Sequence, residues 1–156
     1  MFLRPLAGQG SSYYYLGAEA KAIEGGWESL GDMGWMDEEG YLYLTDRRSD
    51  MIVVGGANIY PAEVEKMLEK HPDIEQACVV PGPDEIKGYK PSAFVVPVDG
   101  KELQEQTVKE FALANGPAYQ HPRQVAFLPS LPLTGTNKID RKALTERAAE
   151  AAKETV

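Results

Sequence analysis

Two adjacent glycines, Gly55 and Gly56, constrain the fold of this chain more than any other short feature. They separate the apolar run at residues 51–54 from a second run at residues 57–60. Because glycine adopts the positive φ angles of a tight turn, this pattern predicts a β-hairpin. Pro61 follows, and proline suits the first position of a helix. The sequence therefore predicts a change from strand to helix at one defined point.

Beyond Pro61 the pattern alternates between helix and strand. Val64, Met67 and Leu68 have helical spacing, and His71-Pro72 should end that helix. Further strands are predicted at residues 74–80, 92–98 and 124–128, and further helices at residues 101–115 (ended by Gly116) and from the cap Asp140 through residue 152. A loop is expected to begin at Pro81-Gly-Pro83. We therefore expect an α+β fold with a small three-stranded sheet, flanking helices and a β-hairpin.

The first 45 residues have a different pattern, with short strands and turns but no helical segment. Strands are expected near residues 2–5, 12–16 and 40–45, the last fed by a turn at residues 37–40. A ribbon of two or three strands without a packing partner is only marginally stable. We therefore expect residues 1–45 to be a β-rich piece of something larger, and residues 50–156 to form a domain of their own.

Composition narrows the class of protein. The chain has 156 residues, 43% hydrophobic and 26% charged, as is typical of a globular protein. Its formal charge of −8 argues against a nucleic-acid partner, which requires a basic face. Cys78 stands alone, so no disulfide can form within the chain, and we interpret it as a small buried hydrophobe. With no long apolar run and no signal peptide, the expected location is cytoplasmic, without a transmembrane segment.

Three motifs carry the functional information. They are Gly31-Asp-Met-Gly-Trp35, the run from Asp46 through Gly55 and Gly56 to Glu65, and the run from Leu131 through Lys138 to Arg141. In this order and spacing they resemble the C-terminal part of the acyl-adenylate-forming enzymes. That superfamily includes acyl-CoA synthetases, firefly luciferase and the adenylation domains of peptide synthetases. The resemblance covers roughly residues 13–145.

Lys138 is the candidate catalytic residue. It follows a loop of small residues, 134–137, that would allow an anion to approach closely, although most lysines of such loops are simply solvated. The resemblance implies that Lys138 contacts the α-phosphate of ATP and the substrate carboxylate. Asn137 stands where the family usually has glycine.

Asp32 and Arg47 are the candidate nucleotide-binding residues upstream. The resemblance implies that Asp32 holds the ribose hydroxyls of ATP or AMP, and that Arg47 reaches the ribose or phosphate side. The plainer alternatives are a turn aspartate and an ion pair of Arg47 with Asp46, Asp50 or Glu39.

The resemblance also implies a moving part. Ser49 stands at the family's hinge, where Asp or Lys is usual. Gly55, Gly56 and Ala57 would line the passage of the pantetheine arm of CoA, or simply form a hairpin turn. Tyr119 and Arg123, with Lys87 and Lys90, could meet the CoA nucleotide by stacking and phosphate pairing, although the family match is loose there.

Other polar residues receive structural interpretations. His121 is expected to be a loop histidine, and His71 to cap the end of its helix. The two histidines and the single cysteine have no metal-ligand spacing, so no metal site is expected within the chain.

The resemblance implies a C-terminal lid domain, residues 49–156, preceded by the tail of the large adenylating domain, residues 1–48, of an AMP-forming acyl-CoA synthetase. The parent enzyme would use a carboxylic acid, ATP and CoA, with Mg²⁺ held in the large domain, and this part alone would be inactive. Two alternatives stay open: an adenylation module that loads a carrier-protein thiol, and a stand-alone binding module.

Overall fold

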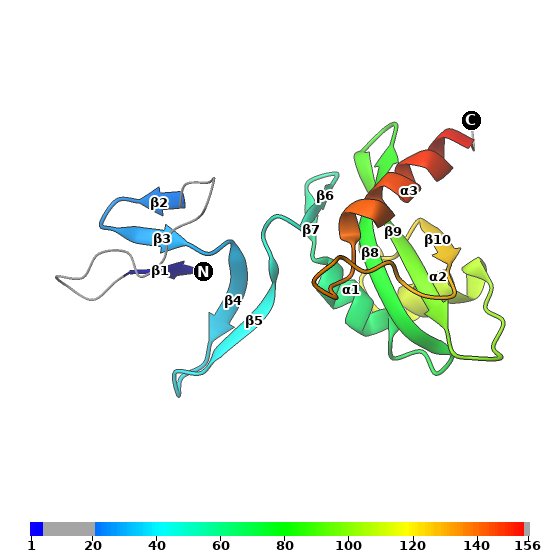
Figure 1. Cartoon of the computed structure of the whole chain (residues 1–156), viewed down its shortest axis with the longest axis horizontal. Coiled ribbons are helices and arrows are strands. Elements are labelled where there is room, and N and C mark those ends of the chain that lie inside the picture. The colour runs from blue at the N-terminus through cyan, green and yellow to red at the C-terminus, as the bar shows by residue number, and fades with distance from the viewer. Residues whose placement is uncertain (5–20, 155–156) are drawn as a thin grey trace. The chain divides into compact units, whose positions relative to one another are not determined.

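The computed structural model describes residues 1–4 and 21–154 (Figure 1). The predicted strand at residues 12–16 lies outside the described residues. The chain divides into two compact units, Met1–Ser49 and Asp50–Val156. The described part of the first unit contains strands and turns, whereas the second combines strands with helices.

Two small sheets make up the described part of the first unit. Strands β1 (Phe2–Leu3) and β2 (Lys21–Ile23) both pair antiparallel with β3 (Trp27–Ser29). Strands β4 (Asp32–Met36) and β5 (Leu42–Arg47) form a separate antiparallel hairpin. Its turn is the predicted one: the backbone N–H of Gly40 donates to Asp37 O at 3.1 Å, and that of Tyr41 donates to Asp37 Oδ1 at 2.8 Å.

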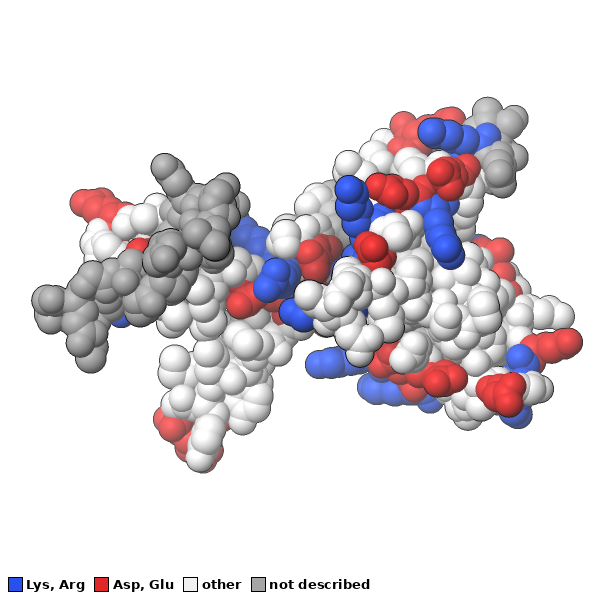
Figure 2. Space-filling view, viewed as in Figure 1, with Lys and Arg blue, Asp and Glu red and all other residues white. Residues whose placement is uncertain are grey.

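The β4–β5 hairpin is apolar and exposed. Trp35 and Tyr43 are cross-strand partners, and their rings stack with centroids 4.4 Å apart. Figure 2 shows this hairpin as a largely uncharged surface with acidic side chains at its tip, which is the turn after Met36. Such pairs stabilise a ribbon, but they leave its apolar faces in water. The exposed large apolar residues of the hairpin are Trp35, Met36, Tyr41, Leu42, Tyr43 and Leu44.

The second unit contains the predicted three-stranded sheet. Its strands lie in the order β10 (Gln124–Phe127), β9 (Gly88–Pro97), β8 (Ile74–Asp84). β8 and β9 are antiparallel, whereas β9 and β10 are parallel and are connected through a helix. A parallel connection requires such a crossover, so the alternation of strand and helix in the sequence is explained by this topology.

Helices cover both faces of the sheet. Helices α1 (Pro61–Leu68) and α2 (Glu105–Asn115) pack on the face that carries Ala77, Val79 and Val95. Helix α3 (Arg141–Glu154) packs on the opposite face through Leu144 and Ala148, against residues such as Cys78, Val80 and Phe94. Successive strand residues point to opposite faces, so one apolar run serves two cores. The fold is therefore α+β, as predicted.

The loop predicted at Pro81-Gly-Pro83 is wrong, because β8 continues through these residues to Asp84. Pro81 pairs with Pro91, and Gly82 pairs with Lys90. A Cβ at Gly82 would collide with Ser92 Oγ, so glycine here permits close strand approach. Long-range pairing with β9 thus overrides a local turn signal. The longer hairpin extends beyond the core and ends in the turn at residues 85–87.

The start predicted for the second helix is also wrong, by four residues. The helix begins at Glu105, after Gln104 in an extended conformation. The preceding Lys101 donates its N–H to Val98 O in a turn, and Leu103 packs on the core outside the helix. Gly116 ends the helix as predicted, with an extended backbone, and donates its N–H to Ala112 O at 3.0 Å. No helix in the described ranges is long and apolar enough to cross a membrane.

Candidate functional site

The predicted hairpin at Gly55-Gly56 is present. Strands β6 (Ile52–Val54) and β7 (Ala57–Ile59) pair antiparallel, and Ile52 faces Ile59 at the buried base. Gly55 and Gly56 have φ angles of 55° and 87°. A Cβ at either position would meet nothing within 4 Å, so the backbone angle, not space, favours glycine here. The hairpin is therefore anchored at Ile52 and Ile59, and its exposed tip, Gly55-Gly56, has no side chains.

Lys138 ends a tight loop. Leu133 and Ile139 form an isolated antiparallel bridge, which closes the loop at its base. Within it, the N–H of Thr134 donates to Lys138 O at 2.7 Å, and the N–H of Lys138 donates to Thr134 Oγ1 at 3.3 Å. The backbone at Lys138 is thus held on both sides, while its side chain is exposed.

Asn137 has a positive φ angle of 61°. Its N–H donates to Thr134 O at 2.9 Å, which completes the turn before Lys138. Asparagine tolerates this left-handed conformation better than most residues that have a side chain. The replacement of the usual glycine at this position is therefore compatible with the same loop geometry.

A partly buried ion pair anchors the chain that leaves this loop. Asp140 caps α3, as predicted, by accepting the N–H of Ala143 at 3.0 Å. Arg141 then forms a bidentate pair with Glu65 of α1, with Nη1–Oε1 at 2.7 Å and Nη2–Oε2 at 2.8 Å. Nη1 also donates to Val79 O at 3.1 Å. Sequence reasoning missed this pair, although Glu65 falls on the apolar stripe of α1, where an unpaired carboxylate would be costly.

The pair shapes the electrostatics of its surroundings. Burial alone would lower the pKa of the Arg141 guanidinium, but its hydrogen bonds to Glu65 and nearby negative charge raise that pKa above its ordinary value. Cys78 lies 3.5 Å from Arg141 Nη1. Burial raises the pKa of the Cys78 thiol to about 12, although the charge of Arg141 opposes the shift. Cys78 is fully buried, as predicted, and stays a neutral thiol.

In the first unit, Asp32 and Arg47 are brought together. They are cross-strand partners in β4 and β5, and Arg47 Nε lies 3.4 Å from Asp32 Oδ1. The sequence alternatives for Arg47 did not include this partner. An open hollow of about 510 Å³ adjoins the pair. It is lined by Ser29, Leu30, Gly31, Arg47, Arg48 and Ser49, so it includes the predicted hinge residue.

In the second unit, a pocket of about 620 Å³ gathers the four residues predicted to meet a nucleotide. Tyr119 and Arg123 come from the segment before β10, and Lys87 and Lys90 come from the β8–β9 hairpin. Val54, the last residue of β6, also lines it. The unexpected extension of β8 and β9 is what carries the lysines to this place. An aromatic ring with three cations has the composition of a site for a phosphorylated base.

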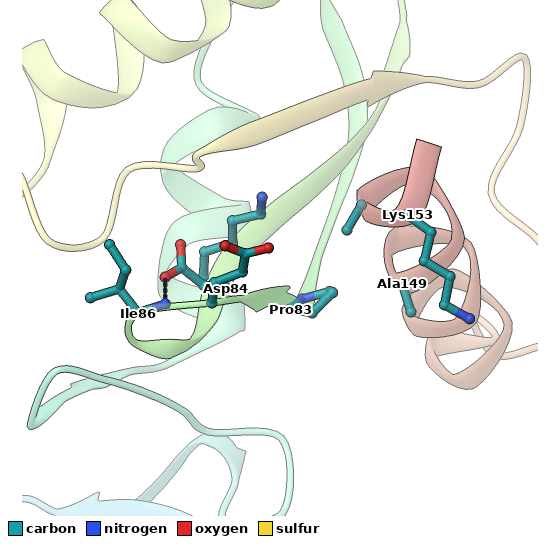
Figure 3. Close-up of a pocket in the computed structure, with 8 residues that line it drawn as sticks. Pro83, Asp84, Ile86, Ala149 and Lys153 are labelled. Atoms are coloured by element: carbon teal, nitrogen blue, oxygen red, sulfur yellow. Dashed lines mark hydrogen bonds between the residues drawn. The ribbon is translucent and has the colours of Figure 1, made fainter. Parts of the chain in front are cut away.

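Asp84 holds the turn of this hairpin (Figure 3). Its Oδ1 accepts the N–H groups of Ile86 at 3.1 Å and Lys87 at 2.9 Å. The hydrogen bond from Lys87 is the largest cause that lowers the pKa of Asp84. The Asp84 carboxylate is therefore ionised and orders the turn beside the two lysines.

Another pocket, of about 670 Å³, lies between the β8–β9 hairpin and the end of α3 (Figure 3). Its apolar lining comes from Pro83, Ile86, Ala149 and Ala152, with Lys90 and Lys153 beside them. No sequence motif indicated this pocket.

The histidines have structural partners. His71 Nδ1 accepts the N–H of Asp73 at 3.1 Å just after α1, and the His71 ring packs edge-on against Phe111. His121 is buried in a loop, with Nδ1 2.6 Å from Ala118 O. Among the described side chains, no three His, Cys, Asp or Glu residues gather as metal ligands would.

The second unit matches a known protein family. The family described as the AMP-binding enzyme C-terminal domain matches residues 63–138, a span that starts on α1 and ends at Lys138. This chain belongs to the adenylate-forming superfamily. The matched residues, 63–138, all lie within the larger, second unit.

Similar members of the superfamily are CoA ligases. A 2-succinylbenzoate–CoA ligase of Geobacillus sp. (strain WCH70) is 43% identical over 83% of this chain and 26% of its own length. Among solved structures, a fatty acyl CoA synthetase of Mycobacterium tuberculosis is 37% identical with a TM-score of 0.69, over 83% of this chain and 26% of its own. The o-succinylbenzoate CoA synthetase of Bacillus subtilis, solved with its acyl-adenylate intermediate, is 38% identical with a TM-score of 0.69, over 78% and 25%.

The chain spans about a quarter of the length of these superfamily relatives. The similarity extends beyond the family match of residues 63–138, because 83% of the chain aligns with the Geobacillus ligase. The activity of a whole synthetase is therefore a matter of proposal for this chain.

Proposed function

We propose that this chain is the C-terminal part of an AMP-forming acyl-CoA synthetase, with Asp50–Val156 as its lid domain and Met1–Ser49 as the tail of its large domain. The observation that carries the choice of CoA is the pocket that joins Tyr119 to three cationic side chains. CoA ends in a phosphorylated nucleotide, which needs such a pocket. A carrier-protein pantetheine has no nucleotide, so this pocket would have no role in loading it.

In the first half-reaction, a carboxylate oxygen attacks the α-phosphorus of ATP, and the bond to pyrophosphate breaks. Negative charge builds on the phosphoryl oxygens as the bonds change. Lys138 is suited to stabilise that charge, because its ammonium is exposed at the end of a loop whose backbone is fixed. A preorganised cation of this kind typically contributes a few kcal/mol to transition-state stabilisation.

Asp32 would hold the ribose of the nucleotide. A carboxylate accepts two hydrogen bonds from a vicinal diol, and the partly exposed Asp32 has an oxygen beyond the one that faces Arg47. Arg47 would orient that carboxylate and face the phosphate side. The Mg²⁺ that accompanies ATP would be held by the large domain of the complete synthetase.

In the second half-reaction, the thiol of CoA attacks the acyl carbon, and AMP leaves with the electron pair of the cleaved bond. The tip formed by Gly55, Gly56 and Ala57 would border the thin pantetheine arm. Val54 lines the pocket and directly precedes this tip, so the proposed arm and nucleotide sites adjoin. Rotation about Ser49 would exchange Lys138 for this face between the two steps.

The test uses the complete synthetase that carries this chain. It is supplied with ATP, Mg²⁺ and a panel of carboxylic acids that includes 2-succinylbenzoate and fatty acids, and AMP and thioester are measured. CoA, pantetheine and a pantetheinylated carrier protein are compared as acceptors. Thioester formation with CoA supports the proposal, and a preference for the carrier would favour the alternative module.

Variants locate the acceptor site. Lys90→Ala and Arg123→Ala should each raise the KM for CoA about tenfold, as expected for loss of one charge-assisted phosphate contact, and leave the KM for pantetheine unchanged. Lys142→Ala, on the exposed side of α3, is the matched control.

The 156-residue chain alone should not catalyse pyrophosphate exchange. Exchange by that chain would contradict the proposal that adenylation also needs the large domain.

A further inference from the structure

Arg141 lies three residues after Lys138 and joins three elements of the second unit. It begins α3, its guanidinium grips Glu65 of α1 through two hydrogen bonds, and it donates to Val79 O of β8. The Glu65 carboxylate also accepts the N–H of Val79 at 2.7 Å. These contacts form one closed network around the guanidinium.

The same side chain reaches toward the start of the unit. Arg141 Nε lies 4.0 Å from Asp50 Oδ2. Asp50 is the first residue of the second unit and directly follows Ser49. One guanidinium therefore links the residue at which the unit begins to the helix that follows the Lys138 loop.

The loop itself makes mainly local contacts. Thr134, Thr136, Asn137 and Lys138 hydrogen-bond among themselves, and all are exposed. Such contacts fix the shape of the loop but not its placement on the domain. Placement depends on the segments at its base. On the outgoing side these segments contact the domain through the apolar packing of Ile139 and Leu144 and through the bidentate Arg141–Glu65 pair.

We propose that Arg141 is a positioning residue for Lys138: with Glu65 as its partner, it sets where the lysine is held relative to α1, β8 and Asp50. This inference rests on the proposed function of Lys138. The planar fork of arginine matches a carboxylate with two parallel hydrogen bonds, whereas a lysine ammonium makes a point contact. Small displacements of a charged group at a reacting centre reduce rates strongly.

The kinetic test compares Arg141→Lys with wild type in the complete synthetase. The kcat of adenylate formation should fall about tenfold or more, with the KM for ATP little changed. Thioester formation from supplied acyl-adenylate should stay within about twofold of wild type, because Lys138 acts in the first step. Arg147→Lys, an exposed arginine on the same helix, should leave both steps unchanged. An equal loss in both half-reactions, or no loss in adenylation, would overturn the proposal.

A second measurement does not depend on activity. In the 156-residue chain, amide hydrogen exchange should speed up at Thr134, Asn137 and Asp140 in Arg141→Lys, and stay unchanged at Val95 in the sheet. If exchange at these loop amides does not change, the positioning role is refuted. If it does change but the wild-type synthetase forms no adenylate from any carboxylate, the proposed function fails and the structural link stands. Glu65→Gln keeps the size of the partner and replaces Arg141→Lys if that variant does not fold.

Discussion

Glu105 accepts a hydrogen bond from the backbone N–H of Val125 at 3.1 Å, so a side chain of α2 occupies a donor on the outer edge of β10. Donors on the opposite edge of the sheet are occupied in the same way. Glu65 and Glu69 accept the N–H groups of Val79 and Ala77 on β8. Open strand edges invite pairing with other chains, and here carboxylates from the protein's own helices occupy edge donors on both sides.

Glu105→Gln should lose stability in a pH-dependent manner. A hydrogen bond from Lys109 is the largest cause that lowers the pKa of Glu105 below 4.5; burial opposes the shift, and the N–H of Val125 adds to it. The pKa of Glu105 is lower in the folded than in the unfolded state. The ionised Glu105 carboxylate therefore stabilises the fold at pH values above its unfolded pKa, and this stabilisation is lost as the pH falls through its folded pKa. Urea unfolding should therefore show a difference from wild type at pH 7 that shrinks below pH 4.5. Glu102→Gln, exposed just before α2, is the control for the loss of one carboxylate charge in this segment.

Lys138→Ala should separate the two half-reactions of the complete synthetase. Adenylate formation should fall by about 10²–10³, the cost of removing one preorganised charge-stabilising group. Thioester formation from supplied acyl-adenylate should survive. Pyrophosphate exchange measures the first step and thioester release the second. Equal loss in both steps would give Lys138 a merely structural role, and Lys142→Ala is the control for a lost charge nearby.

Ser49→Pro should restrict the proposed hinge. Proline fixes φ, removes an N–H and limits the preceding residue, which here is Arg48. The N–H of Arg48 donates to Gly31 O at 2.8 Å, so the chain just before Ser49 is tied to the first unit. If the locked orientation is that of the first step, adenylation should survive and thioester formation should fall steeply. Ser49→Ala should preserve both steps, and unchanged turnover of Ser49→Pro with CoA would remove the hinge role.

Asn137→Ala should cost about 1 kcal/mol of unfolding free energy, because alanine gains nothing at a φ angle of 61° to offset the strain of its Cβ. Asn137→Gly should be neutral or slightly stabilising for the same reason. Urea unfolding of the 156-residue chain measures both. Equal losses for alanine and glycine would show that the asparagine side chain, not its backbone angle, is what the loop needs.

The Cys78 thiol should be inert in the folded protein. Because its pKa is raised from 9.0 to about 12, iodoacetamide at pH 8 should modify it only after unfolding. A raised folded pKa also means that the unfolded state releases its proton first. The free energy of unfolding is therefore unaffected by this thiol below pH 9. Between pH 9 and 12 it falls by about 1 kcal/mol per pH unit, because the Cys78 thiol ionises in the unfolded state only. The stability of Cys78→Ala should fall less steeply over that range, and parallel slopes would contradict the assignment.

The sequence predicted best where local chemistry decides the structure. The hairpin at Gly55-Gly56, the helix after Pro61 and the cap at Asp140 depend on backbone preferences of a few adjacent residues. The extension of β8 through Pro81 was missed because it depends on pairing with β9, which overrides a strong turn signal. Glu65 and Arg141 are 76 positions apart, so no local pattern could pair them. The pocket around Tyr119 and Arg123 was anticipated by residue type, but its lysines reach it only through that unexpected extension.

Both tryptophans of the chain, Trp27 and Trp35, belong to the first unit, in β3 and β4. Tryptophan emission, excited selectively so that tyrosine does not contribute, therefore reports on Met1–Ser49. It does not report directly on the unfolding of Asp50–Val156. Backbone circular dichroism in the helical region has the opposite bias, because all helices of the described residues lie in the second unit. The two signals, recorded in one titration, would follow the two units separately without any label.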